Sequence, residues 1–332
     1  MKRFLVTLML VGVGIVSATA NAITLTPNDV AAHMAEPGHV SIVLHARQLF
    51  DDNKLAPLKA YLSSQPELLQ EEILTILSRR AFDFSRMTSE REAFLTTISQ
   101  QQPKYMVRSQ GDGFWATMPA FNYAGEAKWV LNHWQIHQLQ AQALQLLAAD
   151  QLSLASWLAF SSPDYPLHRQ AVLDAIPSME PAALTKLETV YLNDKNMVWV
   201  PDNAILAALI EHTQSEVLYQ LLWLRRTDSY SLNALLKLSS PPVTPAAITQ
   251  MMAATSNPVL TNSANRQLAQ LHPMPETVKA FMLKQLGNRS IGNDVAVMLA
   301  QHGHKVWLTE LAKTTSGVTR RNIEKGLKTL TQ

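Results

Sequence analysis

The sequence predicts an all-α protein, an α-solenoid of antiparallel helix pairs with a short β-hairpin inserted near residues 104–118. Three observations lead to this prediction. From Thr26 onward, apolar residues recur at intervals of three and four, which places them on one face of a helix. Helix start signals return mostly every 15 residues or so in the second half of the chain. Glycines and aromatic residues interrupt this pattern between Ser109 and Trp129.

The first 22 residues have the order of a secretory signal peptide. Lys2 and Arg3 precede an uncharged apolar run from Phe4 to about Val16, and small residues follow up to Ala22. This run of about 13 residues is shorter than the roughly 20 that a membrane-spanning helix needs. We therefore expect cleavage after Ala22 and a periplasmic or secreted protein without membrane insertion.

The composition argues against several classes of protein. The chain has no cysteine, so disulfides, thiolate metal sites and a cysteine nucleophile are all unavailable. Removal of Lys2 and Arg3 with the signal leaves 26 basic residues against 26 acidic ones, a formal charge of zero. No basic run or basic amphipathic stripe is present that would suit nucleic acid or an anionic membrane. We expect neither of these partners, and the oligomeric state stays open.

Capping and stop signals divide the mature chain into helices. Residues 23–103 are expected to form an N-terminal helical bundle with helices at 27–35, 40–51, 55–64, 66–82 and 89–101. A long helix over residues 126–149 is expected to follow the hairpin. Further helices are expected to start near Pro166, Pro181, Pro201, Ser215, Ser229, Pro245, Pro258, Pro275, Ile291, Lys305 and Val318. Short helices with tight links are antiparallel neighbours that must stack, which predicts a helical repeat array over residues 126–332.

Two segments of this array resemble the second helix of HEAT repeats. PLHRQAVLDAI (residues 166–176) and NPVLTNSANRQLAQL (residues 257–271) begin at or beside a proline and carry alanine and leucine on the face expected to be buried. The resemblance covers about half of the chain and implies a HEAT-like α-solenoid. The sequence departs from that family in its repeat of about 30 residues, where HEAT repeats have about 40 or more, and in an inconsistent Asp and Arg ladder.

Residues 104–125 are expected to form the β-hairpin and a junction loop. Residues 104–109 and 114–118 have strand-like patterns on either side of Gly111-Asp112, a pair typical of a tight turn. Residues 105–134 also hold seven of the chain's 23 aromatic residues. Aromatic side chains anchor protein interfaces, but they also hold a hairpin against helices, and packing is the favoured interpretation. The predicted partner contacts in this region are Phe114, Trp115, Phe121, Tyr123 and Trp129. Trp199, in the link over residues 193–203, is a further predicted contact.

One histidine pair has a spacing that suits a metal ion. His133 and His137 stand four apart on the long predicted helix, so both imidazoles would project from one side. The sequence shows neither a third ligand nor the glutamate of an HExxH motif, so these histidines are weak candidates and surface positions are the favoured interpretation.

Other catalytic patterns are missing. The chain has no Gly-x-Ser-x-Gly elbow and no phosphate-binding glycine loop, and we therefore expect no cofactor. The adjacent carboxylates Asp51-Asp52 and Glu71-Glu72 are expected to be solvated, because neighbouring positions on a helix point apart.

These observations favour a non-catalytic protein. The function that we expect is an exported helical-repeat scaffold or adaptor that binds another protein or an extended peptide in the periplasm. Two alternatives stay open on the sequence: a chaperone-like or foldase-like helper for a secreted enzyme, and a metal-assisted hydrolase of a cell-envelope polymer with His133 and His137 in its site.

Overall fold

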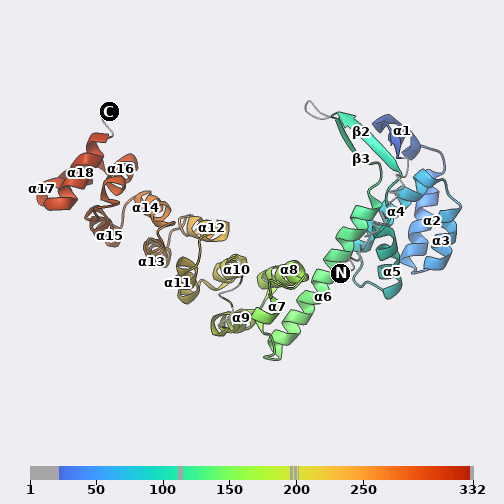
Figure 1. Ribbon diagram of the computed structural model, residues 1–332, viewed down its shortest axis with the longest axis horizontal. Coiled ribbons are helices and arrows are strands. Elements are labelled where there is room, and N and C mark those ends of the chain that lie inside the picture. Colours follow the sequence, from blue (N-terminus) through green and yellow to red (C-terminus); the bar gives the residue numbers. More distant parts are fainter. Residues whose placement is uncertain (1–21, 111–114, 195–196, 198–199, 201, 330–332) are drawn as a thin grey trace, which may run out of the picture. The chain divides into compact units, whose positions relative to one another are not determined.

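The computed structural model describes residues 22–110, 115–194, 197, 200 and 202–329. Within these residues the chain is mostly helical, with eighteen α-helices and one small three-stranded sheet (Figure 1). The all-helical prediction is confirmed at this level. The expected signal peptide lies outside the described residues apart from Ala22. Among the described helices, none combines the length and the apolar character that crossing a membrane requires.

The chain divides into two compact units, unit 1 (Met1–Gln135) and unit 2 (Ile136–Gln332). The helices of unit 1 lie within about three residues of the predicted ones. They are α1 (Pro27–Met34), α2 (His39–Asp51), α3 (Leu55–Ser63), α4 (Glu67–Phe82), α5 (Ser89–Ser99) and the first half of α6 (Tyr123–Ala148). A capping box starts α1: Asp29 N donates to Thr26 Oγ1 over 3.2 Å, and Thr26 N donates to the Asp29 carboxylate over 2.8 Å.

The predicted hairpin is part of a three-stranded sheet. Its strands are β1 (Ile23–Leu25), β2 (Tyr105–Gln110) and β3 (Trp115–Pro119), in the order β1-β2-β3. Strand β3 is antiparallel to β2, whereas β1 pairs with β2 in parallel. Gln110 pairs with Trp115, so residues 111–114 separate the two strands and the predicted turn at Gly111-Asp112 lies outside the described residues. Strand β1 is too short for its alternation to be recognised in the sequence.

The sheet is tied to α4, which places it in unit 1. The Glu71 carboxylate accepts the backbone N–H of Lys104 over 2.6 Å and that of Tyr105 over 3.4 Å. Both Glu71 and Glu72 are buried, so the expectation that this pair is solvated is wrong. Adjacent positions on α4 do point apart, but α4 is covered on both of these sides.

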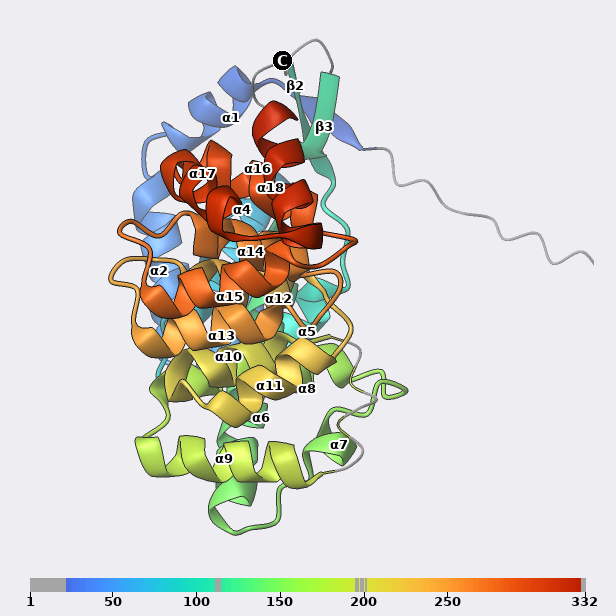
Figure 2. The same ribbon diagram turned by 90° about the vertical axis from the view of Figure 1, so that its left-hand side faces the viewer.

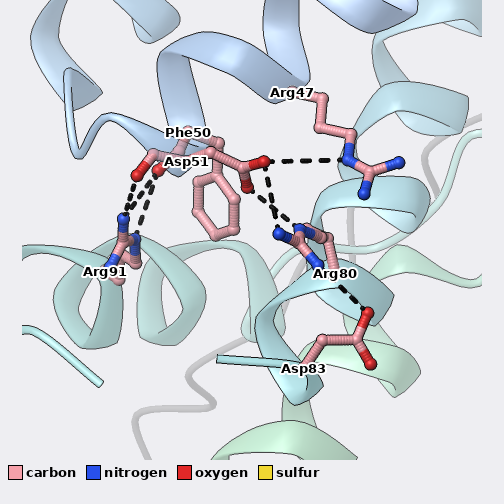
Figure 3. Close-up of polar contacts among 6 residues, drawn as sticks. All are labelled: Arg47, Phe50, Asp51, Arg80, Asp83 and Arg91. Atoms are coloured by element: carbon pink, nitrogen blue, oxygen red, sulfur yellow. Dashed lines mark hydrogen bonds and ion pairs between the residues drawn. The ribbon is translucent and has the colours of Figure 1, made fainter. Parts of the chain in front are cut away.

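The other adjacent carboxylates also have partners. Asp51 at the end of α2 accepts from Arg80 Nε over 3.0 Å and lies 3.8 Å from Arg47 Nε (Figure 3). Asp52 pairs with Lys54 over 3.0 Å at the surface. Asp51 therefore joins α2 to α4, while Asp52 stays largely solvated as expected.

Unit 2 contains the second half of α6 and the remaining helices. Each predicted start lies within three residues of an observed one, and the short α7 and a 3₁₀ turn at Ile176–Ser178 were not predicted. The helices are α7 (Leu154–Trp157), α8 (Tyr165–Ala175), α9 (Pro181–Asn193), α10 (Ala204–Thr213), α11 (Glu216–Leu224), α12 (Ser229–Leu238), α13 (Pro245–Ala254), α14 (Thr261–Ala269), α15 (Glu276–Leu286), α16 (Gly292–Gln301), α17 (Lys305–Thr314) and α18 (Gly317–Thr329).

Contacts in unit 2 join many of the helices to a neighbour in sequence, to the next helix but one, or to both. Helix α10 contacts α8 and α12, α14 contacts α16, and α11 contacts α13. In Figure 1 the even-numbered helices from α8 to α16 form one row and the odd-numbered ones from α9 to α17 form a second. Figure 2 shows α9, α11, α13, α15 and α17 following one another up the picture. One continuous apolar core runs through the unit, from Ala143 to Ile323.

Candidate functional site

The hairpin presents an exposed tryptophan. Trp115 begins β3 and is 56% exposed, and the Arg108 guanidinium carbon lies 4.6 Å from its ring centroid. Met118 on the same strand is also exposed. A cation above an exposed indole holds the ring in place without covering its other face. Trp115 is therefore accessible, as a partner contact requires. Phe114 and Trp199, two further predicted contacts, lie outside the described residues.

Phe121 and Tyr123, two further predicted partner contacts, are buried. Their exposed fractions are 8% and 4%. Burial raises the pKa of the Tyr123 hydroxyl to about 12, with the negative charge of Glu71 adding to the shift. Phe121 lies edge-on to His33, with ring centroids 6.3 Å apart. These side chains pack the junction after the hairpin against the helices of unit 1. Packing of this kind is the interpretation that the sequence favours for the aromatic residues of this region.

A second exposed aromatic surface lies on α6. Trp129 is 53% exposed and stacks on Phe82 with ring centroids 4.8 Å apart. His133 follows one turn later, 4.5 Å from the Phe82 ring. The His133 imidazole is thus engaged by aromatic faces. Neither His133 nor His137 belongs to any group of three or more potential metal ligands among the described residues.

A groove of about 600 Å³ opens in unit 2. Buried apolar side chains from α10 to α12, such as Ala204, Ala234 and Leu238, form its inner wall, and half-buried Leu173 and Ala208 extend that wall. Exposed polar side chains, including Asn233 and Lys237 on α12, form its rim. A concave apolar surface with a few polar groups at its edge is the usual character of a ligand-binding site in proteins.

The charges at the groove neutralise each other. Lys237 Nζ lies 2.6 Å from Glu211 Oε2, which pairs the rims formed by α10 and α12. At one end, Tyr230 accepts a hydrogen bond from Arg169 over 2.9 Å, and Arg169 also pairs with Asp202 over 2.9 Å. The lining therefore offers hydrogen-bonding groups but no unpaired charge that would favour an ionic ligand.

A third feature is a buried cluster of His33, His39 and Glu72 in unit 1. His39 Nε2 lies 2.8 Å from one Glu72 carboxylate oxygen, and His33 Nε2 lies 3.1 Å from the other. The three side chains come from the last turn of α1, the first residue of α2 and the middle of α4. Gly38, with φ of +82°, turns the chain between the two histidines, a conformation that glycine adopts without strain.

The predicted site residues do not include this cluster. His33 and His39 are separated by a turn, so they show no helical spacing, and Glu72 is distant in sequence. One signal was available: Glu72 stands three residues after Leu69 and one before Ile73, within the buried stripe of α4. A carboxylate in that position needs a partner, which the sequence alone does not identify.

Comparisons with known proteins found no relative. No protein-family model matches the chain, and no curated protein or solved structure is significantly similar to it. The function must therefore be argued from the residues themselves.

Proposed function

We propose that the protein is an exported, non-catalytic binding protein whose unit 2 is a HEAT-like helical array that holds a short extended polypeptide segment. The observation that carries this proposal is the groove beside α12. The contacts between neighbouring helices within and across the two rows, such as α10 with α11 and α12, support the array, and the signal-like N-terminus supports export.

The spacing along α12 suits an extended peptide. Tyr230, Asn233 and Lys237 all line the groove, at the i, i+3 and i+7 positions that share one face of a helix. Seven residues of helix rise by about 10 Å, and an extended chain advances about 3.3 Å per residue, so this face matches about three residues of peptide. The Asn233 carboxamide can both donate to and accept from a peptide unit.

The apolar wall of the groove and the Lys237–Glu211 pair at its rim indicate which kind of peptide segment fits. Leu173, Ala208 and Leu236 provide apolar contacts, and the Lys237–Glu211 pair leaves the groove without net charge. An uncharged segment with small or medium apolar side chains would bury its side chains there without leaving a charge unpaired.

The experiment is a binding screen with an immobilised library of short peptides, followed by fluorescence anisotropy on the best binders. The variant Ala208→Trp fills the groove and should weaken peptide binding at least about tenfold, an effect of roughly 1.4 kcal/mol. Val217→Trp, at a position that is 54% exposed on α11 and outside the groove lining, is the matched control and should bind as the wild type does. Equal affinities of the two variants would exclude the groove as the binding site.

The exposed aromatic surfaces of unit 1 are tested separately. Trp115→Ala and Trp129→Ala remove the two accessible tryptophans of the predicted contact set. If either surface contacts a partner, crosslinking of that partner in intact cells should fall with the corresponding variant while groove-peptide affinity stays unchanged. Unchanged crosslinking with both variants would leave these tryptophans without a binding role.

A further inference from the structure

We propose that His33, His39 and Glu72 form a binding site for a divalent transition-metal ion of the zinc type. Among the described residues, these three form a group of potential ligands close enough together to share one ion. Their ligand atoms all lie within 4.8 Å of one another. The site lies entirely within unit 1 and is independent of the groove proposed above.

The burial of the three side chains is the first argument. His33, His39 and Glu72 are 9%, 7% and 3% exposed. A carboxylate taken out of water needs a compensating charge or a full set of hydrogen bonds. His39 Nε2 supplies one hydrogen bond to Glu72, at 2.8 Å. The other carboxylate oxygen, Oε2, is buried and has no hydrogen-bond partner.

The unpaired atoms face each other. His33 Nε2 is also buried without a hydrogen-bond partner, and it lies 3.1 Å from Glu72 Oε2. Two ligand atoms on one tetrahedral zinc ion, with bonds of about 2.0–2.2 Å, stand about 3.3–3.5 Å apart. A cation bound by both atoms would satisfy the two groups together.

The second nitrogen of His33 has a carboxylate nearby. Glu36 Oε1 lies 3.9 Å from His33 Nδ1. A carboxylate on the far nitrogen of a ligating histidine holds the proton there and leaves the other nitrogen free to bind the metal. At 3.9 Å the Glu36 carboxylate forms a long ion pair and not a hydrogen bond, so it adds negative charge beside the proposed site without fixing the ring.

The ligand types define the class of metal. Two imidazole nitrogens and one carboxylate oxygen form a set that suits zinc and related transition metals, whereas calcium and magnesium prefer oxygen ligands throughout. Three protein ligands leave a coordination position for water. Because the three ligands come from α1, α2 and α4, the bound ion would fasten the N-terminal segment to the helices of unit 1.

The test is a zinc titration of the purified protein after chelator treatment, in competition with a chromophoric chelator. We expect one tight site per chain and a rise in Tm when zinc is added. His39→Ala and Glu72→Gln should weaken zinc binding by at least about 100-fold, and Glu36→Gln by less than about tenfold. His137→Ala and His212→Ala, at exposed histidines, are the matched controls and should keep the wild-type affinity.

Cobalt substitution gives a readout on the wild-type protein that does not depend on the folding of any variant. Cobalt bound in a tetrahedral nitrogen and oxygen site should show visible d–d absorption that zinc displaces. Far-UV circular dichroism shows whether each variant remains folded. The proposal is overturned if the wild-type protein takes up no stoichiometric zinc, or if the controls lose binding as strongly as the ligand variants do.

Discussion

Arg91, on α5, joins this helix to the C-terminal end of α2 in unit 1. It is 7% exposed, and its guanidinium donates to the carbonyl oxygen of Phe50 over 3.1 and 3.2 Å and to that of Asp51 over 2.6 Å (Figure 3). These carbonyls end α2, where the helix supplies no further donors, and the Phe50 carbonyl also accepts the backbone N–H of Asn53 over 3.1 Å. The guanidinium also lies 4.1 Å from the ring centroid of Phe84. One side chain therefore caps α2, covers an aromatic ring and connects α5 to both.

We predict that Arg91→Ala lowers the free energy of unfolding of unit 1 by about 2–4 kcal/mol, because it removes the charged donor shared by the Phe50 and Asp51 carbonyls and the guanidinium stacked on Phe84. Arg47→Ala is the matched control. Arg47 is 44% exposed and lies 3.8 Å from Asp51, so its loss should cost less than about 1 kcal/mol. Urea denaturation followed by far-UV circular dichroism measures both. Equal losses would contradict the capping role.

Glu71 and Glu72 show how much a residue's role depends on what covers it. Burial raises the pKa of the Glu71 carboxyl above its ordinary value, although the backbone N–H groups of Lys104 and Tyr105 oppose the shift. Glu71 faces β2 and Glu72 faces the two histidines. Helical geometry alone predicts that they point apart. Their partners are His33 and His39 for Glu72 and the backbone of residues 104–105 for Glu71, all far away in the sequence.

At the scale of elements, the end of unit 2 depends on a close approach of two helices. Helix α18 lies against α16, and Gly326 is the buried point of contact. A Cβ atom at this position would stand 2.6 Å from the Ala296 Cβ and 3.0 Å from the backbone nitrogen of Val297. Glycine inside a helix costs about 1 kcal/mol relative to alanine, and here the missing side chain allows the packing.

We predict that Gly326→Ala destabilises unit 2 by about 1–3 kcal/mol, because the overlap with α16 outweighs the gain in helix propensity. Lys325→Ala, at the exposed neighbouring position, should change stability by less than about 0.5 kcal/mol. Thermal unfolding monitored by circular dichroism provides the comparison. If Gly326→Ala instead raised the thermal stability, the close approach of α18 to α16 would not require glycine at this position.

At the scale of the whole molecule, the described residues form two separate apolar cores. One contains buried residues from Ala46 to Val130, the other buried residues from Ala143 to Ile323, and they share no member. Helix α6 contributes its first half to the first core and its second half to the other. Each core can therefore respond to a cavity without a change in the contacts of the other.

We predict that Leu77→Ala and Leu209→Ala each cost about 2–5 kcal/mol but in different units. Both side chains are fully buried, Leu77 in unit 1 and Leu209 in unit 2. Hydrogen exchange measured by mass spectrometry should show faster exchange of residues 22–135 for the first variant and of residues 136–329 for the second. Faster exchange across both units for either variant would mean that the chain unfolds as one cooperative body.

The sequence by itself determined the helical class, the bounds of the helices in unit 1, the starts of most helices in unit 2 and the two strands of the hairpin. Those features follow from local rules, namely capping side chains such as Thr26, prolines at first turns and apolar spacing along each helix. Only the tertiary structure decided which polar groups are buried. Strand β1, the accessible face of Trp115, the burial of Phe121 and the meeting of His33 with Glu72 all depend on segments distant in the chain. Local rules carry no information about such contacts, because burial is a property of the surface that covers a residue and not of its neighbours in sequence.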